Sequence, residues 1–365
     1  MIYKIKFGGT GKPKKVSGTS SSKLGGKKMI IVLKPNTKKE EIEHVIEEVK
    51  NKGFKPVPFE GDERTVIHAL GAVRDDSPDS FRSIRCVEDV VRILKPYKLA
   101  SKEHHSQKTI VRVGDVAIGN NDFVVIAGPD SVETEKQIIE SAKIMKKNGI
   151  KIMRGSAFKP RTSPYDFQGF GIEGLKLLKK ARDKTGILVE TEVMDVRDVP
   201  IAAQYADILR VGARNMQNFD LLKELGKVDC PVILKRGMSA TIKEFIMAAE
   251  YIMASGNKNV ILCERGIRTF ETAYRNTLDL EAVVVLREET HLPIIVDPSH
   301  ATGNREWVIP LCKAAAAAGA DGILVEVHPD PEKALCDGAQ SLYPEQLTRL
   351  LKELKPICAA VGKKL

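Results

Sequence analysis

Eight short β-rich segments alternate with helical segments, and this repeat limits the possible folds more than any other feature of the chain. The eight segments are FVVIAG (123–128), IKIMRG (150–155), ILVETEV (187–193), DILRVG (207–212), PVILKRG (231–237), NVILCERG (259–266), PIIVDPSH (293–300) and DGILVEVHP (321–329). Between them, apolar residues recur at helical spacing, as at Phe245, Ala248, Ala249 and Ile252. Eight consecutive βα units in about 255 residues predict a (β/α)8 TIM barrel, whereas an open, doubly wound sheet rarely supplies so many. A hairpin is expected at residues 110–119, where it would close the bottom of the barrel.

A smaller unit is expected to precede the barrel. Residues 29–34 are typical of a strand, residues 42–49 show helical apolar spacing, and two further strands fit residues 54–60 and 64–71. A short helix within SPDSFRSI and a last strand within VEDVVRILKP would complete the order βαββαβ, which is ferredoxin-like. This α+β module carries no evident chemistry, which favours regulation or assembly. The predicted domains are therefore a leader (1–28), a ferredoxin-like regulatory domain (29–100) and a catalytic barrel (101–365).

The net charge of +10 suggests nucleic-acid binding until the charges are located along the chain. Residues 1–28 hold eight lysines and no acidic residue, while the remaining 50 basic and 48 acidic residues nearly balance. This low-complexity Gly/Ser/Lys segment is too polar to order itself, so a flexible basic leader or a remnant added by cloning is expected there, and no nucleic-acid partner.

Two further observations bear on the compartment. No apolar stretch approaches the roughly 18 residues that a membrane helix requires, so no membrane association is expected. The six cysteines are scattered without a CxxC pair, as is usual for reduced thiols in the cytoplasm.

Charged residues gather at the predicted ends of the barrel strands, the rim where barrel active sites are built. Six cations follow strands two, four, five and six: Arg154, Lys159, Arg161, Arg214, Lys235 and Arg265. Clustered like charges repel unless anions neutralise them, so the pattern indicates substrates with several negative charges, such as phosphorylated metabolites. His300, Glu326 and Asp337 follow the last two strands, and one histidine with two carboxylates is a typical set of ligands for a divalent metal.

Long ordered motifs resemble one enzyme family over about residues 29–360. The motifs include IAGPDSVE, RGSAFKPRTSPYDFQG, GARNMQNF, CERGIRTFE, VDPSHATG and VEVHPDPEKALCDGAQS. They resemble 3-deoxy-D-arabino-heptulosonate 7-phosphate (DAHP) synthase, in the short-barrel branch related to 3-deoxy-D-manno-octulosonate 8-phosphate (KDO8P) synthase. The stretch at residues 159–163 (KPRTS) is similar to the DAHP synthase version, which favours erythrose 4-phosphate over arabinose 5-phosphate as the aldehyde.

The resemblance implies a role for each site residue. It assigns phosphoenolpyruvate to Arg154, Lys159, Arg214, Lys235 and Arg265, and the sugar-phosphate aldehyde to Arg161, Thr162 and Ser163, with Asp297 also in the substrate site. It assigns a divalent metal to His300, Glu326 and Asp337. By position, Lys159 would protonate the nascent alkoxide, and Glu192 or His300 would help to activate water. The implied reaction is an aldol-type condensation that releases phosphate.

Asp130 departs from the family pattern, which has a metal-binding cysteine at this position. An aspartate keeps the negative charge, so a fourth ligand is retained, and the harder oxygen donor favours Mn²⁺, Mg²⁺ or Fe²⁺ over Zn²⁺. The competing interpretation is that Asp130 caps a helix that begins near Val132. Because Asp130 departs from the pattern, a further interpretation stays open: the protein is a catalytically impaired homologue that binds only an amino acid.

The family resemblance also implies feedback inhibition by tyrosine or phenylalanine through the ferredoxin-like module, and a homotetramer. Gly61, Asp62 and Ser83 lie in predicted loops that could contact such an effector.

Overall fold

The computed structural model describes residues 28–365, except 61–63, 71–78 and 94–95. The chain divides into two compact units, Met1–Lys95 and Pro96–Leu365. Residues 1–27 of the predicted leader (1–28), together with Gly61 and Asp62, lie outside the described residues, and Lys28 is the first residue of a strand. Within these residues, every helix is too short or too polar to cross a lipid bilayer.

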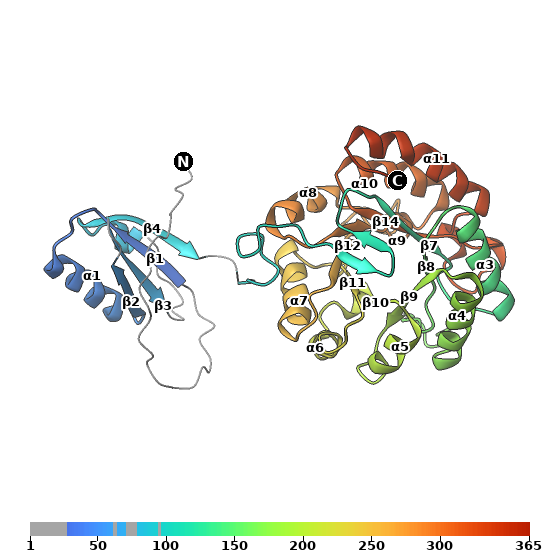
Figure 1. Cartoon of the computed structure of the whole chain (residues 1–365), viewed down its shortest axis with the longest axis horizontal. Coiled ribbons are helices and arrows are strands. Elements are labelled where there is room, and N and C mark those ends of the chain that lie inside the picture. The colour runs from blue at the N-terminus through green and yellow to red at the C-terminus, as the bar shows by residue number, and fades with distance from the viewer. Residues whose placement is uncertain (1–27, 61–63, 71–78, 94–95) are drawn as a thin grey trace. The chain divides into compact units, whose positions relative to one another are not determined.

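Among its described residues, the first unit is a four-stranded antiparallel sheet with two helices. Its elements are β1 (Lys28–Leu33), α1 (Lys39–Asn51), β2 (Lys55–Glu60), β3 (Thr65–Leu70), α2 (Asp79–Arg82) and β4 (Val87–Ile93). The strand order β2-β3-β1-β4 confirms the ferredoxin-like prediction (Figure 1). Buried side chains such as Ile31, Val45, Ile67 and Phe81 form its own core, separate from that of the barrel.

The second unit is a closed barrel of eight parallel strands, as predicted. The strands are β7 (Val124–Gly128), β8 (Ile152–Arg154), β9 (Leu188–Val193), β10 (Ile208–Val211), β11 (Val232–Lys235), β12 (Val260–Glu264), β13 (Ile294–Val296) and β14 (Gly322–Glu326). Pairing of β14 with β7 closes the ring. The surrounding helices are α3 (Glu135–Lys147), α4 (Ile172–Thr185), α5 (Val199–Tyr205), α6 (Phe219–Leu225), α7 (Ile242–Ala254), α8 (Leu280–Glu289), α10 (Arg305–Ala317) and α11 (Pro344–Ala360), with the short α9 (Pro298–Thr302) after β13.

Local sequence explains where these helices begin and end. Thr241 accepts a hydrogen bond from the Glu244 amide and Glu244 reaches back to the Thr241 amide, so a capping box starts α7. Helix α4 ends at Gly186, whose left-handed backbone (φ 68°) suits glycine.

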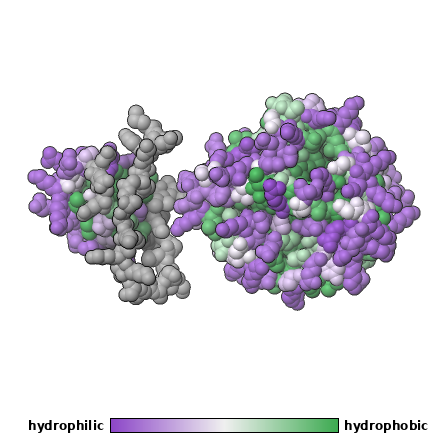
Figure 2. All heavy atoms as spheres, in the orientation of Figure 1, coloured by the Kyte–Doolittle hydropathy of each residue, from purple (hydrophilic) through white to green (hydrophobic). Residues whose placement is uncertain are grey.

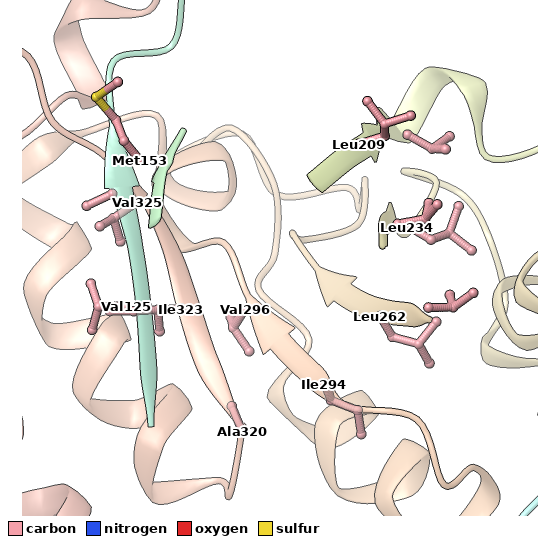
Figure 3. Packing of buried hydrophobic residues seen from close by; sticks show 14 of the residues in the cluster. Val125, Met153, Leu209, Leu234, Leu262, Ile294, Val296, Ala320, Ile323 and Val325 are labelled. Atoms are coloured by element: carbon pink, nitrogen blue, oxygen red, sulfur yellow. The ribbon is translucent and has the colours of Figure 1, made fainter. Parts of the chain in front are cut away.

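Alternating strand residues face two different cores. Val125, Met153, Leu209, Leu234 and Leu262 face outward and pack in the large cluster between strands and helices (Figure 3). Inside the barrel, a layer of isoleucines packs against the hairpin of β5 (Val111–Val113) and β6 (Val116–Ile118); its members are Ile126, Ile152, Ile208, Ile233, Ile261 and Ile295. The predicted hairpin therefore closes the barrel at the end where the strands begin. Hydrophilic residues cover most of the barrel surface visible in Figure 2.

The segment after Pro96 belongs to the barrel, so the boundary predicted at residue 100 lies five residues too late. Tyr97 is buried in the barrel core and donates a hydrogen bond to Glu289. On α7, the Glu250 carboxylate accepts the backbone N–H groups of Lys98, Leu99 and Ala100, each at 2.9 Å. Sequence reasoning missed this attachment because a backbone segment held by a distant carboxylate leaves no periodic pattern.

Replacing Glu250 by Ala removes three hydrogen bonds to an ion, each typically worth about 1.5–3 kcal/mol. Hydrogen exchange of the amides at residues 98–100, followed by mass spectrometry, should accelerate by at least about tenfold. Glu288→Ala, an exposed change at the end of α8, is the control. Equal rates of amide exchange at residues 98–100 in both variants would contradict the attachment of this segment by Glu250.

Candidate active site

The barrel interior changes from apolar to charged towards the carboxyl ends of the strands. Arg154, Arg210, Lys235 and Glu326 stand on strands β8, β10, β11 and β14, and all are buried. Ions in such a position remain stable only when paired. Arg210 donates to Glu190 at 2.7 Å, to Glu192 at 3.0 Å and to Ser156 at 2.6 Å.

Four potential metal ligands meet at this end of the barrel. Asp130 follows β7, His300 lies in α9 after β13, Glu326 ends β14, and Asp337 precedes the 3₁₀ turn at Gly338–Gln340. One ligand atom from each lies within 4.8 Å of all the others. Asp337 adopts a left-handed backbone (φ 53°), a conformation that aspartate tolerates better than most residues. The structure thus brings together the four residues that the sequence proposed as ligands.

The neutral imidazole of His300 and the unused Oε1 acceptor of Glu326 fit a divalent cation. Burial lowers the pKa of His300 to about 3, so its imidazole is neutral at pH 7 and able to bind a metal. Burial and the Asp130 carboxylate raise the pKa of Glu326. Among the described residues, Glu326 Oε1 accepts no hydrogen bond, although Arg154 Nη1 and His300 Nε2 each lie 3.2 Å away. A buried acceptor of this kind suits a cation.

Asp130 is held by two cations. Its Oδ1 accepts a hydrogen bond from Arg154 Nη2 at 2.6 Å, and its Oδ2 lies 2.6 Å from Lys159 Nζ. Although burial opposes ionisation, Lys159 and Arg154 hold the pKa of Asp130 well below its usual range. The interpretation of Asp130 as a helix cap is wrong, because α3 begins at Glu135 and is capped by Thr134.

Cations line a pocket beside the four potential metal ligands Asp130, His300, Glu326 and Asp337, which we call the four-donor group. Its wall includes Asp130, Lys159, Arg161, Thr162, Glu192, Arg214, Lys235, Arg265, His300 and Asp337 from the predicted set. Arg265 is only 4% exposed, and its Nε and Nη1 find no hydrogen-bond partner among the described residues. A buried guanidinium with unused donors on a pocket wall is suited to bind an anion.

Other predicted residues lie behind or beside this wall. Arg154, Asp297 and Glu326 are fully buried and make contacts with residues of the wall. Asp297 accepts a hydrogen bond from Lys235, and its carboxylate lies 2.8 Å from His300 Nδ1. The other ring nitrogen of His300, Nε2, therefore faces Glu326 of the four-donor group. Ser163 is half-buried, accepts the Tyr165 amide and does not line the pocket.

Sequence reasoning missed several residues of the wall. Arg275 enters from the loop after β12, pairs with Asp337 at 3.1 Å and donates to Gln340 Oε1 at 2.9 Å. Cys336 contacts Arg161, and Asp166 pairs with Arg161 at 3.3 Å. Asp166 and Cys336 lie inside motifs quoted above, which could have pointed to them; Arg275 lies eleven residues beyond the end of β12 and had no such signal.

Fold and site together define a (β/α)8 protein with a cation-lined pocket beside four potential metal ligands at the strand ends. Residues 98–360 match the DAHP synthetase I family, and residues 29–95 match the DAHP synthase ferredoxin-like domain. The chain belongs to the DAHP synthetase I family.

Two proteins with known names are similar to this chain in sequence. It is 53% identical to the phospho-2-dehydro-3-deoxyheptonate aldolase of Thermotoga maritima, over 92% of this chain and all of that protein. A 2-dehydro-3-deoxyphosphooctonate aldolase of Geobacter sulfurreducens is 35% identical over 69% of this chain and 98% of its own length.

Two solved structures are also similar. The crystal structure of the Thermotoga maritima DAHP synthase has a TM-score of 0.76 at 52% identity, covering 92% of this chain and 99% of that one. A truncated form of the Thermotoga maritima synthase covers 73% of this chain and 98% of its own, with a TM-score of 0.69 at 51% identity.

Replacing Arg210 by Met leaves Glu190 and Glu192 buried without their cation, which typically costs about 3–5 kcal/mol. The only tryptophan, Trp307, lies in α10 and reports on barrel unfolding. Its fluorescence should show a clearly lower urea midpoint for Arg210→Met. The exposed Arg214, which donates to Thr162 Oγ1 at 3.3 Å, provides the matched control Arg214→Met. Similar midpoints for the two variants would refute a structural role for the Arg210 pairs.

Proposed function

We propose that this chain is a DAHP synthase that condenses phosphoenolpyruvate with erythrose 4-phosphate, releasing phosphate in the first step of the shikimate pathway. One observation carries the proposal: Arg265, with unused buried donors, shares a pocket with Lys159, Lys235 and three of the four potential metal ligands, namely Asp130, His300 and Asp337. Two phosphorylated substrates repel each other, and a pocket with this many cations offsets that repulsion.

The chain's own residues divide the work of the reaction. Arg265 and Lys235 hold phosphoenolpyruvate, while Arg161 and Thr162, also on the pocket wall, hold the aldehyde phosphate. Lys159 is positioned to donate a proton to the alkoxide that forms from the aldehyde. Glu192, 3% exposed and on the pocket wall, orients the attacking water while Arg210 fixes its carboxylate. A divalent cation held by Asp130, His300, Glu326 and Asp337 would supply Lewis-acid polarisation of the aldehyde oxygen.

The direct test is a phosphate-release assay with phosphoenolpyruvate and added Mn²⁺, with the two candidate aldehydes compared. Release with erythrose 4-phosphate, and much less with arabinose 5-phosphate, is expected. The reverse preference would identify a KDO8P synthase. Tyrosine binding without turnover at any metal concentration, restored to turnover by Asp130→Cys, would identify an impaired amino-acid-binding homologue.

The four nitrogen and oxygen donors should favour Mn²⁺, Fe²⁺ or Mg²⁺ over thiophilic ions. In calorimetric titration of the metal-free protein, Asp130→Cys should shift relative affinity towards Zn²⁺ by at least about tenfold, because zinc prefers a thiolate. An unchanged ratio of Mn²⁺ to Zn²⁺ affinity would remove Asp130 from the ligand set.

Lys159→Met should lower kcat by about 10²–10⁴-fold, the usual contribution of a positioned general acid. Lys179→Met, which removes a half-buried α4 lysine paired with Asp183, is the control. Near-normal kcat for Lys159→Met would refute the acid role.

The ferredoxin-like unit is proposed as the sensor of an aromatic amino acid, tyrosine or phenylalanine, in a cytoplasmic homotetramer. Of the proposed contact residues, Ser83 lies among the described residues, where its hydroxyl donates to the Ser80 carbonyl. Removing residues 1–95 and keeping the barrel segment from Pro96 should preserve turnover and abolish inhibition by tyrosine. Inhibition that persists in the shortened protein would place the sensor in the barrel.

A further inference from the structure

Every carboxylate of the four-donor group is already paired with a cation of the chain. Asp130 pairs with Arg154 and Lys159, Glu326 lies 3.2 Å from Arg154, and Asp337 pairs with Arg275. A divalent ion that binds here must therefore compete with side-chain cations for the same oxygens.

Two cations, Arg275 and Lys159, line the pocket and also pair with a carboxylate of the four-donor group, and the more buried of the two is Lys159. It is 6% exposed and lines the anion pocket, yet its ammonium lies 2.6 Å from Asp130 Oδ2 and 3.4 Å from the Asp130 carbonyl. Two further pocket cations pair with carboxylates outside the four-donor group: Lys235 with Asp297, and Arg161 with Asp166. An anion that attracts Lys159 thus draws it away from a potential metal ligand.

Asp130 is able to change partners without leaving its position. Its Oδ2 is buried and, despite the ion pair, accepts no hydrogen bond of good geometry among the described residues. Its Oδ1 remains hydrogen-bonded to Arg154, which is fully buried and fixed from the other side by Glu326. Oδ2 pairs with Lys159 and Oδ1 lies 3.9 Å from His300 Nε2, so separation of the Lys159 pair frees a carboxylate that already borders the other potential ligands.

We propose that the Asp130–Lys159 pair makes metal binding and substrate-anion binding mutually cooperative. The inference rests on the proposed function, because it takes phosphoenolpyruvate as the anion. Both ligands require the same pair to separate: the metal needs Asp130, and the anion needs Lys159. The first ligand to bind bears the cost of separation, so the second binds more tightly, and the enhancement is equal in both directions.

Direct attraction between a bound cation and a bound anion would also produce cooperativity, but it would not depend on this pair. Asp130→Asn distinguishes the two explanations, because the amide keeps the size of the side chain and removes its charge. Lys159→Met removes the same pair from the other side, so the test does not depend on the folding of one variant. Asp166→Asn is the matched control, since it neutralises the carboxylate that pairs with a different pocket cation, Arg161.

The experiment measures free Mn²⁺ by electron paramagnetic resonance while the full-length protein is titrated, with and without saturating phosphoenolpyruvate. Calorimetry measures phosphoenolpyruvate binding with and without saturating Mn²⁺. For the unmodified protein we expect each ligand to tighten the other by the same factor, within the usual range of about 5–150-fold. In Asp130→Asn and Lys159→Met the factor should fall below about twofold, and Asp166→Asn should keep the original factor.

Several results would overturn the inference. Binding of both ligands to the unmodified protein without mutual effect would do so, as would an undiminished factor in Asp130→Asn or Lys159→Met, or an equal loss in Asp166→Asn. These outcomes leave the proposed function intact. Failure of the unmodified protein to bind either Mn²⁺ or phosphoenolpyruvate overturns the proposed function as well.

Discussion

The site depends on Arg154, a buried guanidinium that joins Asp130 after the first barrel strand to Glu326 at the end of the last. Its Nη2 donates to Asp130 at 2.6 Å and its Nη1 lies 3.2 Å from Glu326. A fully buried cation requires this compensation, because its transfer out of water is costly. The contact therefore fixes two carboxylates of the four-donor group across the seam where β14 meets β7.

The same principle extends through the carboxyl-terminal layer of the barrel. Arg210 is fixed by Glu190 and Glu192, and Lys235 by Asp297, so the charges hold one another at fixed positions before any ligand arrives. Groups held rigidly in a low-dielectric interior interact more strongly with a ligand than solvated ones do. The isoleucine layer beneath supplies the dry floor of this arrangement. The barrel thus separates a stabilising apolar half from a polar half that is suited to chemistry.

Asp130 illustrates which part of the site the sequence motifs could predict. The sequence identified it as the position that departs from the family pattern and offered two interpretations, a metal ligand or a helix cap. The structure removes the second, since Thr134 caps α3. It also shows what neither interpretation contained, the ion pairs of Asp130 with Arg154 and Lys159, because their donors lie 24 and 29 residues away along the chain.

The sequence alone determined both architectures and most members of the site. Strand and helix periodicities are local, and a closed parallel barrel places every strand end on one rim, so His300, Glu326 and Asp337 could be grouped without coordinates. Only the tertiary structure decided which charges pair, that Arg275 joins Asp337, that Ser163 stays off the pocket wall, and that residues 96–100 attach to the barrel through Glu250. These features depend on distances between side chains on separate loops, and such distances leave no periodic trace in the order of residues.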